Sequence, residues 1–389
     1  MPSFISYFPT PLGNFFKGAL FTPLLVAGLG FGNPVWADDD HNRGENDGAL
    51  RLLSLTPVPV AKTNTTPGMY VFDISFVDQA THRYYLADRT NKAIDIFDTR
   101  TDKYLGRVAG FVGFDKSNDN AGPNGVVTAN SGSQIWAGDG DSTVKVIDVK
   151  TMKIVDTIKT GGTNRADEVA YDAKDSVFIV ANDADDPPFV TLISTKPGHK
   201  ILGKISFPDA TDGIEQSGYF APNGMIYTDI PELKKDKSQG ALAVIDPRSA
   251  KLVKMIPVAN CLPHGLAIGY DSKLFLGCNA GNPRAGLPAQ TAVYDVKTGK
   301  VTAIPGMGGS DEASVNPKTG QYYAAGANNA DGAALGVIDA KTNTLAQKVP
   351  TSGQAHSVAV SFANNHVYVP MRASNGPCGG CVAVFAPQK

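Results

Sequence analysis

Residues 293–300 read Val-Tyr-Asp-Val-Lys-Thr-Gly-Lys, an apolar pair followed by a turn sequence that begins with Asp. Similar pairs recur at intervals of 50, 46, 52, 49, 44 and 47 residues, and they begin at Ile96, Val146, Leu192, Val244, Val293, Val337 and Val384. Asp follows five of the seven pairs. Because an Asp at the first position of a turn accepts hydrogen bonds from backbone N–H groups two residues further on, these copies predict tight β-hairpins.

Each pair belongs to a unit with four short runs of β-branched and aromatic residues, as at 125–129, 134–137, 143–147 and 154–158 in the second unit. Four strands with this period are typical of a β-propeller blade. The seventh unit has three runs, and residues 50–60 (LRLLSLTPVPV) offer the missing strand. Such a strand would close the ring and remove an exposed sheet edge. The sequence therefore predicts an all-β, seven-bladed β-propeller with four antiparallel strands per blade, over residues 49–389.

Composition limits the fold and the partners. The chain has 389 residues, 41 Gly, 26 Pro and 19% charged residues, which argues against helical bundles and disorder. Lys plus Arg number 35 and Asp plus Glu 37. A nucleic-acid-binding protein needs a concentrated basic surface, so we expect no nucleic-acid partner.

The first 37 residues have the order of a secretory signal peptide: one base, Lys17, an apolar run at 18–32, and small residues before a cut after Ala37. The alternative is an uncleaved membrane anchor, but Gly and Pro interrupt the run before it reaches a span of about 20 apolar residues. Residues 38–48 are polar and are expected to form a flexible lead-in. We therefore expect a periplasmic or secreted monomer with no stable membrane span after cleavage.

The blade pattern, with its turn of the form Asp-x-Lys-Thr-x-Lys at 295–300, resembles the YVTN-repeat family of secreted seven-bladed propellers over nearly the whole mature chain. The resemblance implies the fold. Family members and fold relatives include binding proteins, dehydrogenase subunits, lactonases and a metal-dependent streptogramin lyase, so the fold alone does not select a function.

One polar residue per unit stands just before the first strand, at spacings of 51, 43, 48, 49, 47 and 45 residues: Asp73, Asn124, Asp167, Glu215, His264, Asp311 and His356. Inner strands of a propeller surround its axis, so these residues are predicted to ring one mouth of the axial channel. The residues that follow three of them, Glu168, Gln216 and Glu312, add further oxygen ligands.

The ring predicts a site for a divalent metal or a small-molecule or peptide ligand. Oxygen ligands suit calcium or magnesium, whereas imidazoles with carboxylates suit zinc, iron or manganese. The predicted metal ligands are Asp73, Asp167, Glu215, His264, Asp311 and His356, and the predicted catalytic groups are His264 and His356, because a histidine can act as general base near neutral pH. The alternative is that these residues are simply solvated in a water-filled channel.

Long second-to-third-strand loops at 182–188, 231–240, 279–290 and 372–380 are predicted to join the ring face, where binding sites concentrate. Arg89, Arg165, Arg284 and Arg372 fall near this face and could hold an anion; the alternative for each is a surface charge. We expect Arg89, Asn124, Glu168, Glu312 and Arg372 to contact the ligand.

Four cysteines fit an oxidising compartment. Cys261 and Cys278 are predicted to be neighbours at the ring face, and Cys378 and Cys381 share one loop. An even count with such proximity favours two disulfides. A redox pair would need a helix start that this loop lacks, and a zinc site would have to join the two pairs across the ring.

Two hypotheses remain from the sequence. The first is a propeller enzyme of lyase or lactonase type that binds a small ligand with a divalent metal. The second is a non-catalytic binding or assembly module of YVTN type that uses the same face. Clustered histidines and carboxylates favour the first, since protein recognition would favour aromatic anchors in the loops.

Overall fold

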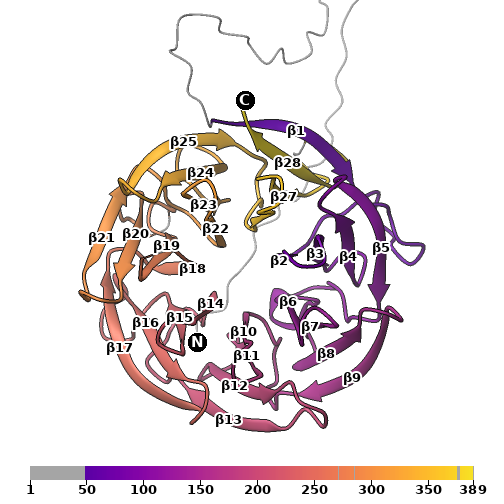
Figure 1. Cartoon of the computed structure of the whole chain (residues 1–389), viewed down its shortest axis with the longest axis horizontal. Helices are drawn as coiled ribbons and strands as arrows, with labels where there is room; N and C mark the ends of the chain where they lie inside the picture. Colours follow the sequence, from indigo (N-terminus) through magenta and orange to yellow (C-terminus); the bar gives the residue numbers. More distant parts are fainter. Residues whose placement is uncertain (1–48, 270, 284, 375–376, 389) are drawn as a thin grey trace, which may run out of the picture. The chain divides into compact units, whose positions relative to one another are not determined.

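The computed structural model describes residues 49–269, 271–283, 285–374 and 377–388. These residues form seven four-stranded antiparallel sheets arranged as blades around a ring (Figure 1). The first three blades contain β2 (Ser75–Asp78), β3 (Arg83–Asp88), β4 (Ala93–Asp98) and β5 (Lys103–Ala109); β6 (Val126–Ala129), β7 (Gln134–Asp139), β8 (Thr143–Asp148) and β9 (Lys153–Lys159); and β10 (Val169–Asp172), β11 (Val177–Asn182), β12 (Phe189–Ser194) and β13 (Ile201–Ser206).

The next three blades contain β14 (Ser217–Phe220), β15 (Met225–Ile230), β16 (Gln239–Asp246) and β17 (Lys251–Ala259); β18 (Pro263–Ile268), β19 (Lys273–Cys278), β20 (Gln290–Asp295) and β21 (Val301–Pro305); and β22 (Ala313–Asn316), β23 (Gln321–Gly326), β24 (Ala334–Asp339) and β25 (Thr344–Pro350). The described residues include a short 3-10 turn, η1 (Asn118–Asn120), and no α-helix.

The seventh blade joins the two ends of the described chain. It contains β26 (Ala359–Val360), β27 (Val367–Met371), β28 (Cys381–Pro387) and, as its outer strand, β1 (Leu50–Pro57). β1 pairs antiparallel with β28, from Leu50 opposite Pro387 to Pro57 opposite Cys381. The predicted closure by an N-terminal strand is therefore confirmed, as is the all-β seven-bladed class.

The hairpin turns form as the repeat predicts. Asp295 Oδ1 accepts hydrogen bonds from the backbone N–H groups of Lys297 at 2.9 Å and Thr298 at 3.0 Å. Asp339 Oδ1 accepts in the same way from the two backbone N–H groups that follow Ala340. The repeated Asp thus stabilises the turn between the third and fourth strands of a blade.

The hydrophobic core lies between adjacent blades. Trp136 of the second blade packs against Phe178 of the third with ring centroids 5.0 Å apart, and Phe275 of the fifth stacks on Tyr322 of the sixth at 4.7 Å. All four side chains are buried. Apolar burial is thus satisfied between the sheets, which leaves the inner strands to line the axis.

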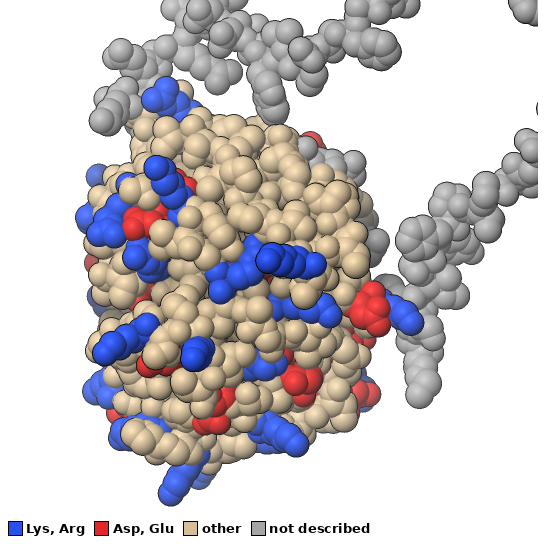
Figure 2. All heavy atoms as spheres, turned by 90° about the vertical axis from the view of Figure 1, so that its right-hand side faces the viewer, with Lys and Arg blue, Asp and Glu red and all other residues tan. Residues whose placement is uncertain are grey.

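The described residues make one compact unit by their contacts. In the part of the chain that the structure describes, no helix is long and apolar enough to cross a membrane. Figure 2 shows one side of the molecule, where Lys and Arg lie in small groups separated by uncharged surface and by Asp and Glu. The predicted signal peptide at 1–37 and lead-in at 38–48 lie outside the described residues and stay predictions.

Candidate functional site

Six of the seven residues predicted to ring the channel line one cavity of about 210 Å³, which we call the acidic cavity. They are Asp73, Asp167, Glu215, His264, Asp311 and His356. The neighbouring carboxyl groups Glu168 and Glu312 line it too. The register of the repeat thus places side chains that are far apart in the sequence around one space.

Backbone hydrogen bonds between blades hold this ring. Gly125 N–H donates to Asp167 O at 3.1 Å, Gln216 N–H to His264 O at 3.0 Å, and Glu312 N–H to His356 O at 3.0 Å. The first of these bonds requires glycine, because a Cβ at Gly125 would lie 2.3 Å from the Asp167 carbonyl oxygen. Each bond joins one blade to the ring residue of the next.

The acidic cavity adjoins a mouth cavity of about 360 Å³, and the two share the lining residues Asp73, Arg165, Asp311, Asn328 and His356. Arg89 and Arg372 line only the mouth cavity. Charged groups of both signs therefore lie along one path from the mouth inward, with arginines at the mouth and most carboxyl groups further inside.

A buried hydrogen-bond network joins three blades at the mouth. Arg89 is 5% exposed and donates to Asp73 Oδ2 at 2.5 Å and to Asn124 Oδ1 at 2.9 Å. Asn124 Nδ2 donates to Ala166 O at 2.7 Å. Burial acts to raise the pKa of Asp73, but Arg89 and then His356 outweigh it and lower that pKa to about 2. Asp73 is therefore an ionised carboxylate.

Arg165 makes a second network rather than a surface charge. It forms ion pairs with Asp167 and Asp183, and its Nη1 donates to Asn118 O at 3.0 Å. Its side chain is half-buried, and burial acts to lower its pKa, but the two aspartates raise that pKa well above the ordinary value. Arg165 thus holds the two aspartates in place at the wall of the cavity.

Carboxyl groups without an arginine partner collect deeper in the cavity. Burial, then the charge of Glu312, raises the pKa of Glu168 well above its ordinary value, and burial, then Asp311, does the same for Glu312 and Glu215. Glu168 and Glu312 come from the third and sixth blades, and each affects the pKa of the other. The neutral form of these carboxyl groups is therefore favoured.

The two ring histidines differ in environment. His356 Nδ1 faces the carbonyl of Gln354 at 2.8 Å, its Nε2 faces Asp73 Oδ1 at 3.5 Å, and its ring stacks on Phe72 at 4.8 Å. Burial acts to lower the pKa of His356, but the hydrogen bond to Asp73 and the charge of Asp311 raise it. Proton binding at this ring is therefore favoured by its carboxylate partner.

His264 is held between a carbonyl and an amide. Its Nδ1 lies 2.9 Å from Leu262 O, and its Nε2 lies 3.2 Å from Asn279 Nδ2 and 3.9 Å from Glu215 Oε1. The carbonyl can only accept, so Nδ1 carries the proton and donates. Nε2 then accepts from the Asn279 amide and points toward the acidic cavity, which Asn279 also lines.

The structure places several predicted residues outside the roles that the sequence suggested. Asn124 lines neither cavity, because its side chain bridges Arg89 and Ala166. Gln216 is not an additional ligand of the ring: its Oε1 accepts from Leu266 N–H and Ala313 N–H, so it braces neighbouring blades. Arg284 lies outside the described residues.

Arg372 lines the mouth cavity, and its Nε is a buried donor that has no hydrogen-bond partner among the described residues. It comes from the predicted loop at 372–380, as Asp183 and Asn279 come from two of the other predicted loops. Phe114, Asn118 and Asn328 also line the mouth, and sequence reasoning missed them. Phe114 and Asn118 belong to the connection between blades, where no repeat pattern marked them.

The predicted divalent metal stays a prediction. Within the described part of the chain, no group of three or more His, Cys, Asp or Glu side chains lies as a ligand set for a metal ion. The physical reason is that Asp73 and Asp167 point their oxygens at Arg89 and Arg165. In their present positions the side chains of the ring do not form a metal-binding site, so no catalytic role is assigned to a metal.

Both cysteine pairs form disulfides, Cys261–Cys278 and Cys378–Cys381. The first lies three residues before His264 and directly before Asn279. Backbone bonds from Asn279 N–H to Leu262 O and from Ala280 N–H to Cys261 O, both 2.9 Å, extend this link. The disulfide therefore positions the hydrogen-bonded pair of His264 and Asn279 at the cavity.

The fold and the ring define a seven-bladed β-propeller with a charged axial cavity. No family model and no curated protein matches the chain, so the likeness to YVTN repeats rests on the repeat residues alone. Among solved structures the chain is similar to one titled Kuenenia stuttgartiensis Hydrazine Synthase, with a TM-score of 0.66 and 14% identity, covering 84% of this chain and 98% of that one. At this identity the similarity shows the fold and nothing about activity.

Proposed function

We propose that this protein is a binding propeller that holds a small, positively charged ligand in the acidic cavity of its axial channel. The observation that carries the proposal is the composition of the acidic cavity. Six carboxyl groups line it, from Asp73, Asp167, Glu168, Glu215, Asp311 and Glu312, against one arginine and two histidines.

Electrostatics favour a cation over an anion here. Burial, and then repulsion from neighbouring carboxylates, raises the pKa of Glu168, Glu215 and Glu312, so placing these groups together is costly when they are ionised. A cation in the cavity would relieve that repulsion and displace protons from them. Affinity for a cation is therefore expected to rise with pH as these carboxyl groups ionise.

The test uses Glu215→Gln with Asp311→Asn, which removes two charges but keeps side-chain shape, and Asp212→Asn as the matched control on the exposed surface. Putrescine and the chloride salts of Ca²⁺, Mg²⁺, Mn²⁺ and Zn²⁺ serve as probes, in titration calorimetry at pH 6 and pH 8. We expect at least one probe to bind the native protein and the control, more tightly at pH 8, and to lose at least tenfold affinity in the double variant. Absence of binding by every probe, or equal affinity in the double variant, would overturn the proposal.

The ion series also tests the predicted divalent metal. If putrescine binds and the four metal ions do not, the ligand is an organic cation. A metal that co-purifies in stoichiometric amount, measured by mass spectrometry of the purified protein, would instead support the metal. The two disulfides support a place outside the cytoplasm, as expected for a periplasmic or secreted protein.

A lyase- or lactonase-type enzyme is the second candidate, favoured by the pairing of His356 with Asp73. With its pKa raised, the His356 imidazolium faces the cavity and could donate a proton to a leaving group. His264 could act as general base through Nε2 once a ligand displaces the Asn279 amide. Release of acid from a lactone panel, measured by pH-stat, should occur with the native protein and be lost in His356→Gln. Absence of turnover leaves the binding role standing and contradicts the enzyme.

A further inference from the structure

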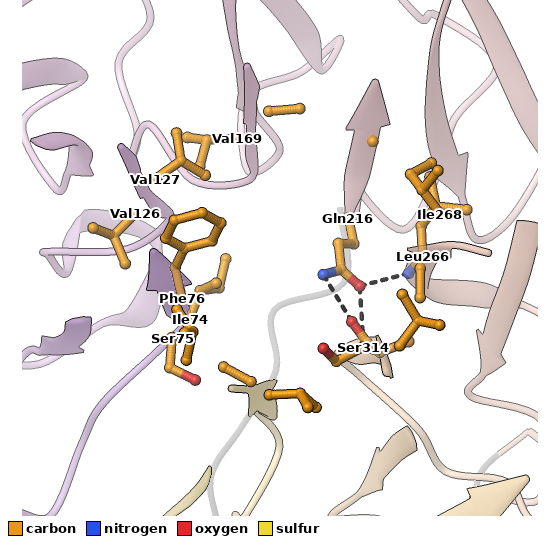
Figure 3. A pocket seen from close by; sticks show the side chains of 18 of the residues that line it. Ile74, Ser75, Phe76, Val126, Val127, Val169, Gln216, Leu266, Ile268 and Ser314 are labelled. Atoms are coloured by element: carbon orange, nitrogen blue, oxygen red, sulfur yellow. Dashed lines mark hydrogen bonds between the residues drawn. The ribbon is translucent and has the colours of Figure 1, made fainter. Parts of the chain in front are cut away.

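A second cavity occupies the opposite end of the axial channel. Its volume is about 540 Å³, and every blade contributes to its wall. We call it the apolar cavity, after the side chains of Phe76, Val127, Val169, Leu266, Ile268 and Val360. Figure 3 shows Phe76, Val126, Val127 and Val169 on one side of the space and Leu266 and Ile268 on the other.

The two cavities meet near the middle of the channel. Ile74 and Glu168 line both of them. The ring residues precede the inner strands, whereas the apolar cavity also reaches Gln79 and Ala80 after β2 and Phe362 after β26. It therefore lies toward the face opposite the acidic cavity.

The glutamine side chains at the wall are committed to hydrogen bonds within the protein, whereas Oδ2 of the wall residue Asp78 is buried without a partner among the described residues. Gln216 accepts from two backbone N–H groups and donates to Ala313 O at 3.3 Å (Figure 3). Gln79 Nε2 donates to Val360 O at 2.7 Å, and its Oε1 accepts from Phe362 N–H at 2.8 Å. These glutamines hold neighbouring blades together, so they offer little to a ligand.

The wall residues Ser75 and Ser217 are also hydrogen-bonded within the protein. Ser75 and Ser357 share a hydrogen bond of 2.8 Å, and Ser217 bonds to Thr228 at 2.9 Å. A buried water typically makes two to four hydrogen bonds to polar groups, and an apolar wall with committed polar groups does not supply them. The space is therefore poorly suited to ordered water and well suited to apolar surface.

We propose that the apolar cavity is a binding site for an uncharged, mainly apolar small molecule, distinct from the cation site. Its volume falls within the roughly 300–1,000 Å³ of small-molecule pockets, which are mostly apolar with few polar groups. A peptide fits it less well, because the peptide's own N–H and C=O groups would be buried without partners. A charged molecule would lose its hydration among apolar side chains, and an anion would find no Lys, Arg or His among the described residues of the wall, whose carboxyl groups are Asp78 and Glu168.

The test uses the uncharged fluorophore N-phenyl-1-naphthylamine. Val127→Trp and Ser314→Trp fill the cavity from two different blades, and Val155→Trp is the matched control on β9, where Val155 is 56% exposed. We expect saturable one-to-one fluorescence enhancement in the native protein, unchanged affinity in the control, and at least tenfold weaker binding in each filling variant that keeps its native circular dichroism. Absence of saturable binding in the native protein, or equal affinity in the filling variants and the control, would overturn the proposal.

Two further arms define the ligand and the site. Naphthalene should displace the fluorophore at least tenfold better than naphthalene-1-sulfonate or 1-naphthylmethylammonium; equal competition by either charged compound contradicts an uncharged ligand. The Glu215→Gln, Asp311→Asn variant should bind the fluorophore with unchanged affinity. Parallel loss in that variant would place the probe at the acidic cavity and refute a separate site.

Discussion

The ion pair between Arg89 and Asp73 allows a quantitative test of the network at the channel mouth. The two side chains are 6% and 12% exposed and lie 2.5 Å apart. The net effect of its surroundings lowers the pKa of Asp73 from 3.8 to about 2. A pKa difference of one corresponds to 1.36 kcal/mol, so the ionised form contributes about 2 kcal/mol to the free energy of unfolding at pH 7.

Replacing Arg89 by Met should cost at least that much. The variant leaves a buried carboxylate without its main partner, and breaking a buried pair typically costs about 3–5 kcal/mol. The assay is a double-mutant cycle in urea at pH 7 with Arg89→Met, Asp73→Asn and the double variant. We expect a coupling energy of about 2 kcal/mol.

The sign of the pH dependence follows from the lowered pKa. The contribution of Asp73 is present above pH 3.8, the value of the unfolded chain, and it is lost as pH falls toward 2. The coupling measured at pH 7 should therefore persist at pH 5 and shrink at pH 3. A coupling below about 0.5 kcal/mol at pH 7, within the usual additivity error, would refute the assignment of Arg89 as the group that keeps Asp73 ionised.

Three further outcomes are expected. Because the pKa of His356 is raised, its pairing with Asp73 adds stability below pH 6.5, and this contribution is lost as pH rises through the raised pKa. His356→Gln should therefore lower the urea midpoint at pH 6 and leave it unchanged at pH 9. Because the pKa of Glu312 is raised in the folded protein, stability falls as pH rises above 4.5, the ordinary pKa of a glutamate. Glu312→Gln should therefore flatten the decline of the thermal midpoint between pH 5 and pH 8. An unchanged slope would contradict this. Replacing Cys261 and Cys278 together by Ser opens a link across 17 residues, which should cost about 3 kcal/mol in denaturant unfolding, whereas a loss below about 1 kcal/mol would show that the disulfide contributes little.

Much of the fold could be predicted from the sequence because the strands of a propeller blade are consecutive in the chain. Hairpins, strand runs and the repeated Asp all depend on residues close together in the chain, and the repeat multiplies each weak signal seven times. The closing strand was predictable for the same reason: the last unit lacked a strand and residues 50–57 supplied one. The ring of polar residues was also visible, since its members keep the period of the blades.

The spacing of the blade repeat did not predict which side chains bond to one another within the site. Arg165 was expected to hold an anion or to be a surface charge, yet its half-buried side chain pairs with Asp167 and Asp183. Gln216 was expected among the oxygen ligands, yet its amide braces neighbouring blades. Both outcomes depend on side-chain directions across blade interfaces, which the spacing of residues along the chain does not specify.

The sequence by itself determined the number of blades, the closure of the ring and the register that sends six polar residues to one end of the axis. Only the tertiary structure decided which of those residues are neutralised and which are left facing one another. Arg89 pairs with Asp73, while burial and neighbouring carboxyl groups raise the pKa of Glu168 and Glu312, which lie three blades apart. The physical reason is that the curvature of the closed ring brings side chains from non-adjacent blades together, and charge interactions depend on those distances rather than on position in the chain.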